Sequence, residues 1–224
     1  MRVSRCLLTV SAALGGRRGG AFGVRLCDEN VIFVMGGPGA GKGTQCAKLA
    51  SKLDLCHLSA GELLRQEVAS GSVRGKSIAK TISEGKIVQS STTVGLLVKE
   101  LGKRRGPFLI DGFPRSLENL RAYEESVGDC SFMLYLEVPE DEMLCRLLNR
   151  GKSSGRSDDN ELTIRKRFRT FMRDSLPVVA ELEARGLLRR VDAMGDPDVV
   201  YDRVCSVLAQ ESGFERIDSA PACS

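Results

Sequence analysis

The feature that most constrains this chain is a short apolar run that leads directly into a glycine-rich turn. Residues 31–35 (VIFVM) are apolar and partly β-branched, which is typical of a strand buried in a parallel sheet. The turn GGPGAGKGT follows at residues 36–44, and residues 44–53 then have helical spacing with Leu49 and Leu53 on one face. A strand, a glycine turn and a helix in this order indicate an α/β fold and carry the pattern G-x-x-x-x-G-K of phosphate-binding loops.

The glycines of this turn predict a cradle of backbone N–H groups around phosphate oxygens. A glycine leaves the backbone accessible, and the helix that follows adds the positive end of its dipole. Lys42 is expected to reach the β- and γ-phosphates of ATP, whereas Gly43 stands where the general pattern has a hydroxyl ligand for magnesium, which comes one residue later. A glycine turn that binds nothing is the alternative, which the flanking elements and the lysine disfavour. The predicted ATP-binding residues of the turn are Gly37, Gly39, Ala40, Gly41, Lys42, Gly43 and Thr44.

Composition limits the class of protein. A chain of 224 residues with 42% hydrophobic and 28% charged residues suits one globular domain. No apolar run approaches the length of about 18 residues that a membrane-spanning helix needs, so no membrane partner is expected. The eight cysteines contain no C-x-x-C pair and His57 is the only histidine, so we expect neither a zinc site nor a disulfide scaffold.

Residues 1–29 are predicted to be a leader that lies outside the fold. Residues 1–27 contain five arginines and no acidic residue, a composition typical of a mitochondrial transit peptide. A secretory signal around residues 7–14 and an extension without targeting function are the alternatives, and a cytoplasmic location is the alternative to a mitochondrial one. The domain is expected to comprise residues 30–212, followed by a flexible tail at residues 213–224.

Positive charge is concentrated late in the chain. Residues 146–173 contain nine basic and three acidic residues, although the whole chain has a formal net charge of only +4. Such a segment favours an anionic partner, which could be nucleic acid, a membrane surface or a small phosphorylated ligand. A solvated helix face is the alternative, and composition does not choose between them.

A second buried strand is predicted at residues 107–111 (PFLID), and it ends in the carboxylate of Asp111. In folds with a phosphate-binding loop, an acid at the tip of the neighbouring strand holds magnesium directly or through water. We therefore expect Asp111 to hold magnesium through water. A turn cap is the alternative, because Gly112 follows.

Three segments together resemble the nucleoside monophosphate kinases of the adenylate kinase and UMP–CMP kinase group. They are GGPGAGKGTQ at 36–45, DGFPR at 111–115 and RGKSSGRSDDN at 150–160. The resemblance implies a P-loop NTPase with a five-stranded parallel sheet flanked by helices, a monophosphate-binding helical segment at 59–88 and a short lid at 151–160. The apolar runs agree, since they predict strands at 31–35, 56–59, 107–111, 131–137 and 187–192 with helical patterns between them.

The resemblance also implies roles for individual residues. Arg65 and Arg115 match the pair that grips the monophosphate, and Arg150, Arg156 and Arg167 match arginines around the phosphoryl group in transfer. Guanidinium groups suit that task because they carry a permanent charge and several donors. Gly195 matches a late loop whose backbone touches ATP, with a plain turn as the alternative. The lid residues Asp158 and Asp159 are expected to pair with arginine on closure, and the absence of cysteine excludes zinc there. The predicted catalytic residues are Lys42, Arg115, Arg150, Arg156 and Arg167.

Two positions indicate which monophosphate is the acceptor. Ala60 and Asn119 stand where adenylate kinases usually have threonine and glutamine, and both match the UMP–CMP kinase pattern. We expect the Asn119 amide to suit uracil or cytosine by rotating, because it offers a donor at one end and an acceptor at the other. The residues predicted to bind the monophosphate are Ala60, Arg65, Lys86, Ile87, Val88, Gly112, Arg115 and Asn119.

The predicted activity is ATP-dependent phosphorylation of UMP or CMP, with dCMP as a further acceptor and magnesium as cofactor. Adenylate kinase is the alternative, because residues 65–76 (RQEVASGSVRGK) look more like the short adenylate kinases and Gln89 replaces a usual proline. A scaffold that binds nucleotide or RNA without turnover is a further alternative. With only 5% aromatic residues, a surface that stacks bases is not expected. We therefore expect small nucleotides as partners, no nucleic acid, and a monomer.

Overall fold

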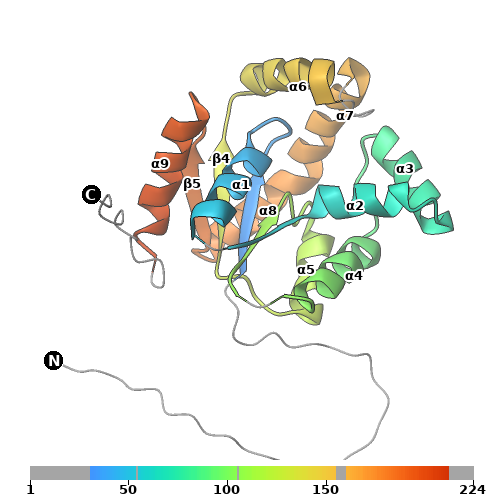
Figure 1. Ribbon diagram of the computed structural model, residues 1–224, viewed down its shortest axis with the longest axis horizontal. Coiled ribbons are helices and arrows are strands. Elements are labelled where there is room, and N and C mark those ends of the chain that lie inside the picture. Colours follow the sequence, from blue (N-terminus) through green and yellow to red (C-terminus); the bar gives the residue numbers. More distant parts are fainter. Residues whose placement is uncertain (1–30, 54, 105, 155–159, 212–224) are drawn as a thin grey trace, which may run out of the picture.

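The computed structural model describes residues 31–53, 55–104, 106–154 and 160–211. The predicted leader, the predicted tail and the lid residues Arg156, Asp158 and Asp159 lie outside these ranges. The described chain forms a five-stranded parallel sheet in the order β2-β3-β1-β4-β5 with helices on both faces (Figure 1). The predicted fold class is confirmed.

The strands begin and end within one residue of the predicted positions. Their bounds are β1 Val31–Gly36, β2 Cys56–Ser59, β3 Phe108–Asp111, β4 Phe132–Glu137 and β5 Leu188–Asp192. All six residues of β1 are buried, because β1 lies in the centre between β3 and β4. The glycine turn therefore leaves the sheet at its central, fully buried strand.

The helices of the described chain connect these strands. They are α1 Lys42–Leu53, α2 Ala60–Ala69, α3 Val73–Ser83, α4 Ser90–Leu101, α5 Leu117–Ser126, α6 Glu140–Ser154, α7 Glu161–Thr170, the π-helix η1 Phe171–Ser175, α8 Leu176–Ala184 and α9 Pro197–Leu208. Helix α6 continues to Ser154, so the first four residues of the predicted lid are helical. Within the described part of the chain, no helix combines the length and the apolar character needed to cross a bilayer.

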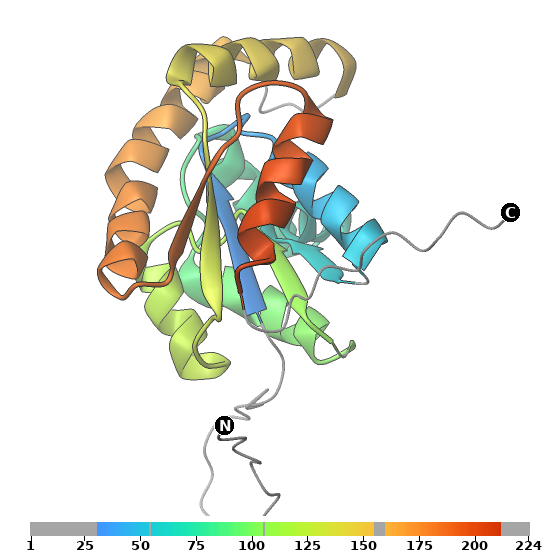
Figure 2. The ribbon, with the colours of Figure 1, turned by 90° about the vertical axis from the view of Figure 1, so that its left-hand side faces the viewer.

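Successive side chains of β1 point to opposite faces of the sheet, and each face has its own half of the apolar core. Phe33 and Met35 pack on one face of the sheet with apolar residues of α4, α5 and α8. Ile32 and Val34 pack on the other face with residues of α1 and α9, which lie side by side in Figure 2. Each fully buried aliphatic or aromatic side chain contributes about 1.5–3 kcal/mol, so both halves stabilise the strand that carries the turn.

Side-chain caps fix where several of the helices begin. Ser59, Ser72, Ser116 and Asn160 precede α2, α3, α5 and α7, and each side chain accepts a hydrogen bond from the backbone N–H three residues later. Each such cap stabilises its helix by about 1 kcal/mol. The first residue of each of these helices, and hence the last residue of the loop before it, follows from local sequence.

Helices α2 and α3 project together at the opposite end of the molecule from α9 (Figure 1). Their crossing depends on Gly75, because a Cβ added there would lie 2.3 Å from the backbone oxygen of Glu67 in α2. Backbone cannot move away as a flexible side chain can. The close contact between the two helices therefore requires glycine at this position.

Gly75→Ala should destabilise the protein by about 1–3 kcal/mol, because the added methyl group forces α2 and α3 apart. Gly95→Ala in α4 is the matched control, since a Cβ there would meet no atom within 4 Å. The control should be neutral or stabilising by up to about 1 kcal/mol, because alanine favours helix over glycine. Denaturant unfolding measures both variants, and equal effects would contradict the prediction.

Candidate active site

The glycine turn packs closely against α6, and at Gly39 a side chain would meet backbone. A Cβ added to Gly37 would lie 2.3 Å from Sδ of Met143, and one added to Gly39 would lie 2.6 Å from the Met143 backbone oxygen. Gly39 and Gly41 also have φ angles of +86° and +84°, which glycine adopts without strain. The turn is therefore held in one shape, with its backbone accessible from the carboxyl end of β1.

Lys42 is the first residue of α1 and folds back over this turn. Its Nζ donates hydrogen bonds of 2.8 Å to the backbone oxygens of Gly36 and Gly37. Burial lowers the pKa of Lys42 to about 8, with a further contribution from Arg115 and Arg167, although Asp111 acts in the opposite direction. The protein's own groups thus compensate the ammonium charge poorly, and an anion beside it would be stabilised.

Asp111 lies at the end of β3 against the start of α1. A Cβ added to Gly43 would lie 3.5 Å from Oδ2 of Asp111. Burial alone would raise the pKa of this carboxyl group, but the positive charges of Lys42 and Arg115 help to hold the pKa below its usual value. An ionised carboxylate beside a phosphate-binding turn fits magnesium, which prefers oxygen ligands and retains water. Among the described residues, no group of three or more His, Cys, Asp or Glu side chains is placed to hold a metal, so phosphate and water would have to complete the coordination.

His57 lies near the carboxylate of Asp111. Its Nε2 is 3.8 Å from Oδ2 of Asp111, which is beyond hydrogen-bonding distance. Within the described chain this buried nitrogen has no hydrogen-bond partner. The two side chains are neighbours because β2 pairs with β3, which aligns Ser59 with Asp111.

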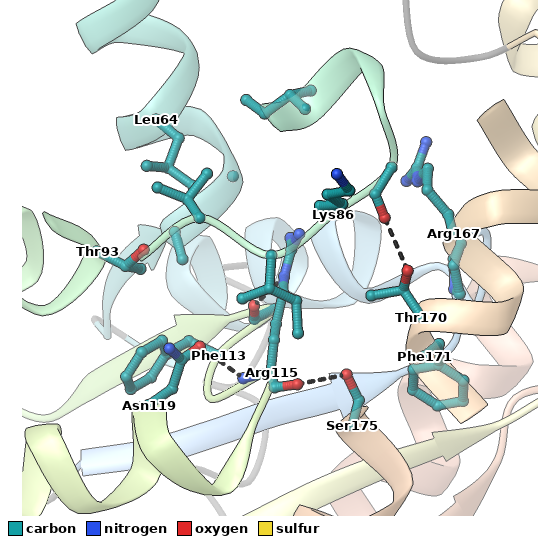
Figure 3. A pocket seen from close by; sticks show the side chains of 18 of the residues that line it. Leu64, Lys86, Thr93, Phe113, Arg115, Asn119, Arg167, Thr170, Phe171 and Ser175 are labelled. Carbon is teal, nitrogen blue, oxygen red and sulfur yellow. Dashed lines mark hydrogen bonds between the residues drawn. The ribbon is translucent and has the colours of Figure 1, made fainter. Parts of the chain in front are cut away.

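One pocket gathers residues from five parts of the chain (Figure 3). All eight residues predicted to bind the monophosphate line it, together with Lys42 and Arg167. The lining also includes Leu64, Ile82, Thr93, Phe113, Thr170, Phe171 and Ser175, which sequence reasoning did not assign to the site. That the eight residues bind a monophosphate stays a prediction, but the structure brings them together.

The cations of the pocket lie close to one another beside two glycines. A Cβ on Gly61 would lie 3.4 Å from Nη1 of Arg65 and 3.6 Å from Nη2 of Arg115. A Cβ on Gly112 would lie 3.3 Å from Nη2 of Arg115 and 3.9 Å from Cε of Lys42. The three cationic side chains thus form a row that passes over two glycines. Such a row can hold two phosphate groups beside each other.

Neighbouring groups orient the two arginines of this row. Nε of Arg115 donates to the backbone oxygen of Gly112 at 2.8 Å, and the backbone oxygen of Arg115 accepts from Oγ of Ser175 at 2.8 Å. Arg65 donates to one carboxylate oxygen of Glu62 from Nε at 3.1 Å and from Nη2 at 2.8 Å. This ion pair is partly exposed, so a phosphate can replace it at small cost.

The Asn119 amide is held on both sides, which corrects the expectation that it rotates to suit different bases. Its Oδ1 accepts from the backbone N–H of Arg115 at 3.1 Å, and its Nδ2 donates to Oγ of Ser90 at 2.8 Å. A backbone N–H only donates, so a rotated amide would set two donors against each other. The amide therefore keeps one orientation.

Helix α7 and the π-helix η1 close one side of the pocket. Oγ1 of Thr170 donates to the backbone oxygen of Gly85 at 2.9 Å, which joins α7 to the loop that carries Lys86. The π-helix then places Phe171 and Ser175 on the same wall. Phe171 also belongs to the apolar core. No sequence pattern signalled the π-turn, because it depends on packing around it.

Two other predicted residues lie away from this pocket. Arg150 lies on α6 and Gly195 in the loop between β5 and α9, and neither lines the pocket. Arg146 connects these two regions, since its Nη1 donates to the backbone oxygen of Ala193 at 3.2 Å. Helix α6 thus contacts both the glycine turn and the loop that carries Gly195. Contact of Arg150 and Gly195 with nucleotide stays a prediction.

Comparison with known proteins finds similarity to adenylate kinases and to UMP-CMP kinases. The adenylate kinase family model matches residues 34–187. The chain is 43% identical to adenylate kinase isoenzyme 1 of Homo sapiens over 188 residues, which cover 82% of this chain and 96% of that protein. It is 47% identical to UMP-CMP kinase 3 of Arabidopsis thaliana over 184 residues, which cover 81% of this chain and 90% of that protein. It is also 47% identical to UMP-CMP kinase of Prunus armeniaca, over 80% of this chain and 78% of that protein.

ATP binding should weaken as the pH rises above about 8, where Lys42 loses its proton in the free protein. Bound phosphates raise the pKa of Lys42, so binding takes up a proton and affinity falls where free Lys42 is neutral. The dissociation constant of a non-hydrolysable ATP analogue should rise by up to about tenfold per pH unit in this range. Equilibrium titration between about pH 7 and pH 9.5 measures it.

Lys42→Met is the control, because methionine keeps the length of the side chain and has no titrating group. This variant should bind the analogue weakly with no comparable rise over the same pH range. Its turnover should fall at least about 100-fold while its melting curve stays close to that of the wild type. An equal pH dependence in both proteins would show that another group titrates.

Proposed function

Because this chain belongs to the adenylate kinase family of nucleoside monophosphate kinases, we propose that it transfers the terminal phosphoryl group of ATP to UMP or CMP. The observation that carries the choice of a pyrimidine is the pair Ala60 and Asn119, which line the same pocket. They stand where the resemblance to adenylate kinases leads one to expect threonine and glutamine. Both are almost fully buried, with exposed fractions of 2% and 1%, so their size bears directly on the space available.

The proposed mechanism relies on position and charge rather than on a nucleophilic side chain. The backbone of the glycine turn and Lys42 would hold the β- and γ-phosphates, and Arg65 and Arg115 would hold the acceptor phosphate. Phosphoryl transfer has a loose transition state whose charge is spread over three oxygens, so aligned cations stabilise it. Magnesium, when bound through water to Asp111, would neutralise charge on the triphosphate.

Space rather than hydrogen-bond polarity would separate cytosine from adenine. Both bases carry an exocyclic amino donor beside a ring acceptor, so an amide in one orientation suits either. Asn119 is one methylene shorter than glutamine, and its Cα is fixed on α5. Ala60 lacks the polar group of a threonine. A difference of one methylene or one hydroxyl in such a pocket changes specificity by about 10- to 200-fold.

Adenylate kinase activity is the second candidate. The 43% identity to adenylate kinase isoenzyme 1 of Homo sapiens favours it as much as the plant relatives favour a pyrimidine. Residues 65–76 also look more like the short adenylate kinases. Steady-state kinetics with UMP, CMP, dCMP and AMP side by side distinguish the two. A higher kcat/KM for AMP than for either ribopyrimidine would overturn the proposal.

Ala60→Thr combined with Asn119→Gln should shift preference towards AMP. The ratio of kcat/KM for AMP to that for CMP should rise at least about tenfold, because both substitutions restore the side chains expected in adenylate kinases. A coupled ADP-release assay measures it. Gln66→Ala in α2 is a control on an exposed position, and it should leave the ratio unchanged. An unchanged ratio in the double variant would place specificity elsewhere.

We also propose that residues 1–29 direct the chain to mitochondria, on the basis of the five arginines and the absence of acid in residues 1–27. Residues 1–29 fused to a fluorescent reporter should carry it into mitochondria. The same fusion with these arginines changed to glutamine should remain in the cytosol. Equal distribution of the two fusions would contradict the proposal.

A further inference from the structure

The side of the pocket where Asn119 is expected to contact the base, here called the base side, depends on a residue that does not line the pocket. Ser90 is the first residue of α4, and only 4% of it is exposed. Its Oγ accepts the 2.8 Å hydrogen bond from Nδ2 of Asn119, which lies 29 residues later in the chain. Asn119 itself is on α5 and lines the pocket. Ser90 thus supports the predicted base-contacting side chain from behind.

The two partners of Asn119 contribute differently. The backbone N–H of Arg115 is a donor only, so it determines that Oδ1 and not Nδ2 faces it. Ser90 then supplies an acceptor for the opposite end of the amide. Without the Ser90 hydroxyl, an N–H of Asn119 would be buried without a partner, and the amide would move to find one.

What remains of the Asn119 amide after these two bonds is one N–H and one oxygen lone pair. These are the groups that can contact a base in the pocket. We propose that Ser90 is a positioning residue for base recognition, because its hydroxyl holds the Asn119 amide so that a fixed donor and a fixed acceptor face the base. This rests on the proposed function only in that Asn119 contacts the base of whichever monophosphate the protein accepts.

The same contacts join the base side of the pocket to its phosphate side. Asn119 bonds the backbone of Arg115, whose guanidinium group lies beside Lys42 and Arg65 across two glycines. Figure 3 shows Arg115 between Asn119 and Ser175. Ser175 holds the backbone oxygen of Arg115 independently. Loss of Ser90 should therefore disturb binding of the base much more than the alignment of the phosphates.

A role in starting α4 is the rival explanation for Ser90. Gln89 precedes the helix and makes no side-chain capping bond, so the first turn of α4 has no local cap. Under that explanation, substitution would lower stability and act alike on all kinetic constants. The two explanations therefore predict different changes in KM relative to kcat on substitution of Ser90. Only the positioning role requires Asn119 for the effect.

Ser90→Ala should raise the KM for the preferred monophosphate about tenfold, with kcat changed less than about threefold and the KM for ATP unchanged. Ser90→Thr retains the hydroxyl and should restore most of the affinity. Ser91→Ala, one residue further along α4, is the matched control at an exposed position and should match the wild type. If Ser90→Ala does not fold, Ser90→Cys provides the test, since sulfur is a weak acceptor of similar size.

A double-mutant cycle with Asn119→Ala decides whether Ser90 acts through Asn119. In the Asn119→Ala background, Ser90→Ala should cause no further rise in the KM for the monophosphate. An equal rise in both backgrounds, or no rise in the wild type, would overturn the proposal. The cycle is measured with whichever monophosphate the wild type prefers. A preference for AMP would therefore defeat the pyrimidine proposal and leave the Ser90 proposal to be judged separately.

Discussion

The site depends on holding three cations close together. Lys42, Arg115 and Arg65 form a row over Gly61 and Gly112. Backbone oxygens of Gly36, Gly37 and Gly112 accept hydrogen bonds from Lys42 and Arg115, and the Glu62 carboxylate accepts those of Arg65. Asp111 lies nearby as an anion. Phosphate oxygens are stronger partners than carbonyl oxygens because they carry charge. The protein's own groups therefore position these cations, and positioning of this kind is what phosphoryl transfer requires.

The scaffold holds this row by placing its supports on separate elements. The central strand β1 is buried on both faces and ends in the glycine turn, so the turn has a rigid base. Helix α7 and η1 reach over from a later part of the chain, and their hydroxyl groups bond the backbones of Gly85 and Arg115. The pocket is thus a meeting point of segments that are far apart in sequence. Movement of α7 would change both of these walls at once.

Much of the fold and site could be predicted because the signals are local. The five strands lie within one residue of the predicted positions, since buried apolar runs bounded by turns identify them. The residues predicted to bind the monophosphate all line one pocket, because the carboxyl ends of parallel strands meet at one edge. The extension of α6 to Ser154, the π-turn at 171–175 and the nearness of His57 to Asp111 were not foreseen. Each of these depends on packing between elements, which leaves no periodic pattern in the sequence.

The amino-acid sequence alone determined the phosphate-binding turn, the order of the elements and the family, because glycine conformations, apolar periodicity and motif spacing act over a few residues. Only the tertiary structure decided the orientation of the Asn119 amide. That orientation comes from a donor-only backbone N–H at Arg115 and from a buried hydroxyl at Ser90, 29 residues away in the chain. A hydrogen bond between distant residues forms only after α4 and α5 have packed. Local sequence therefore carries no record of it.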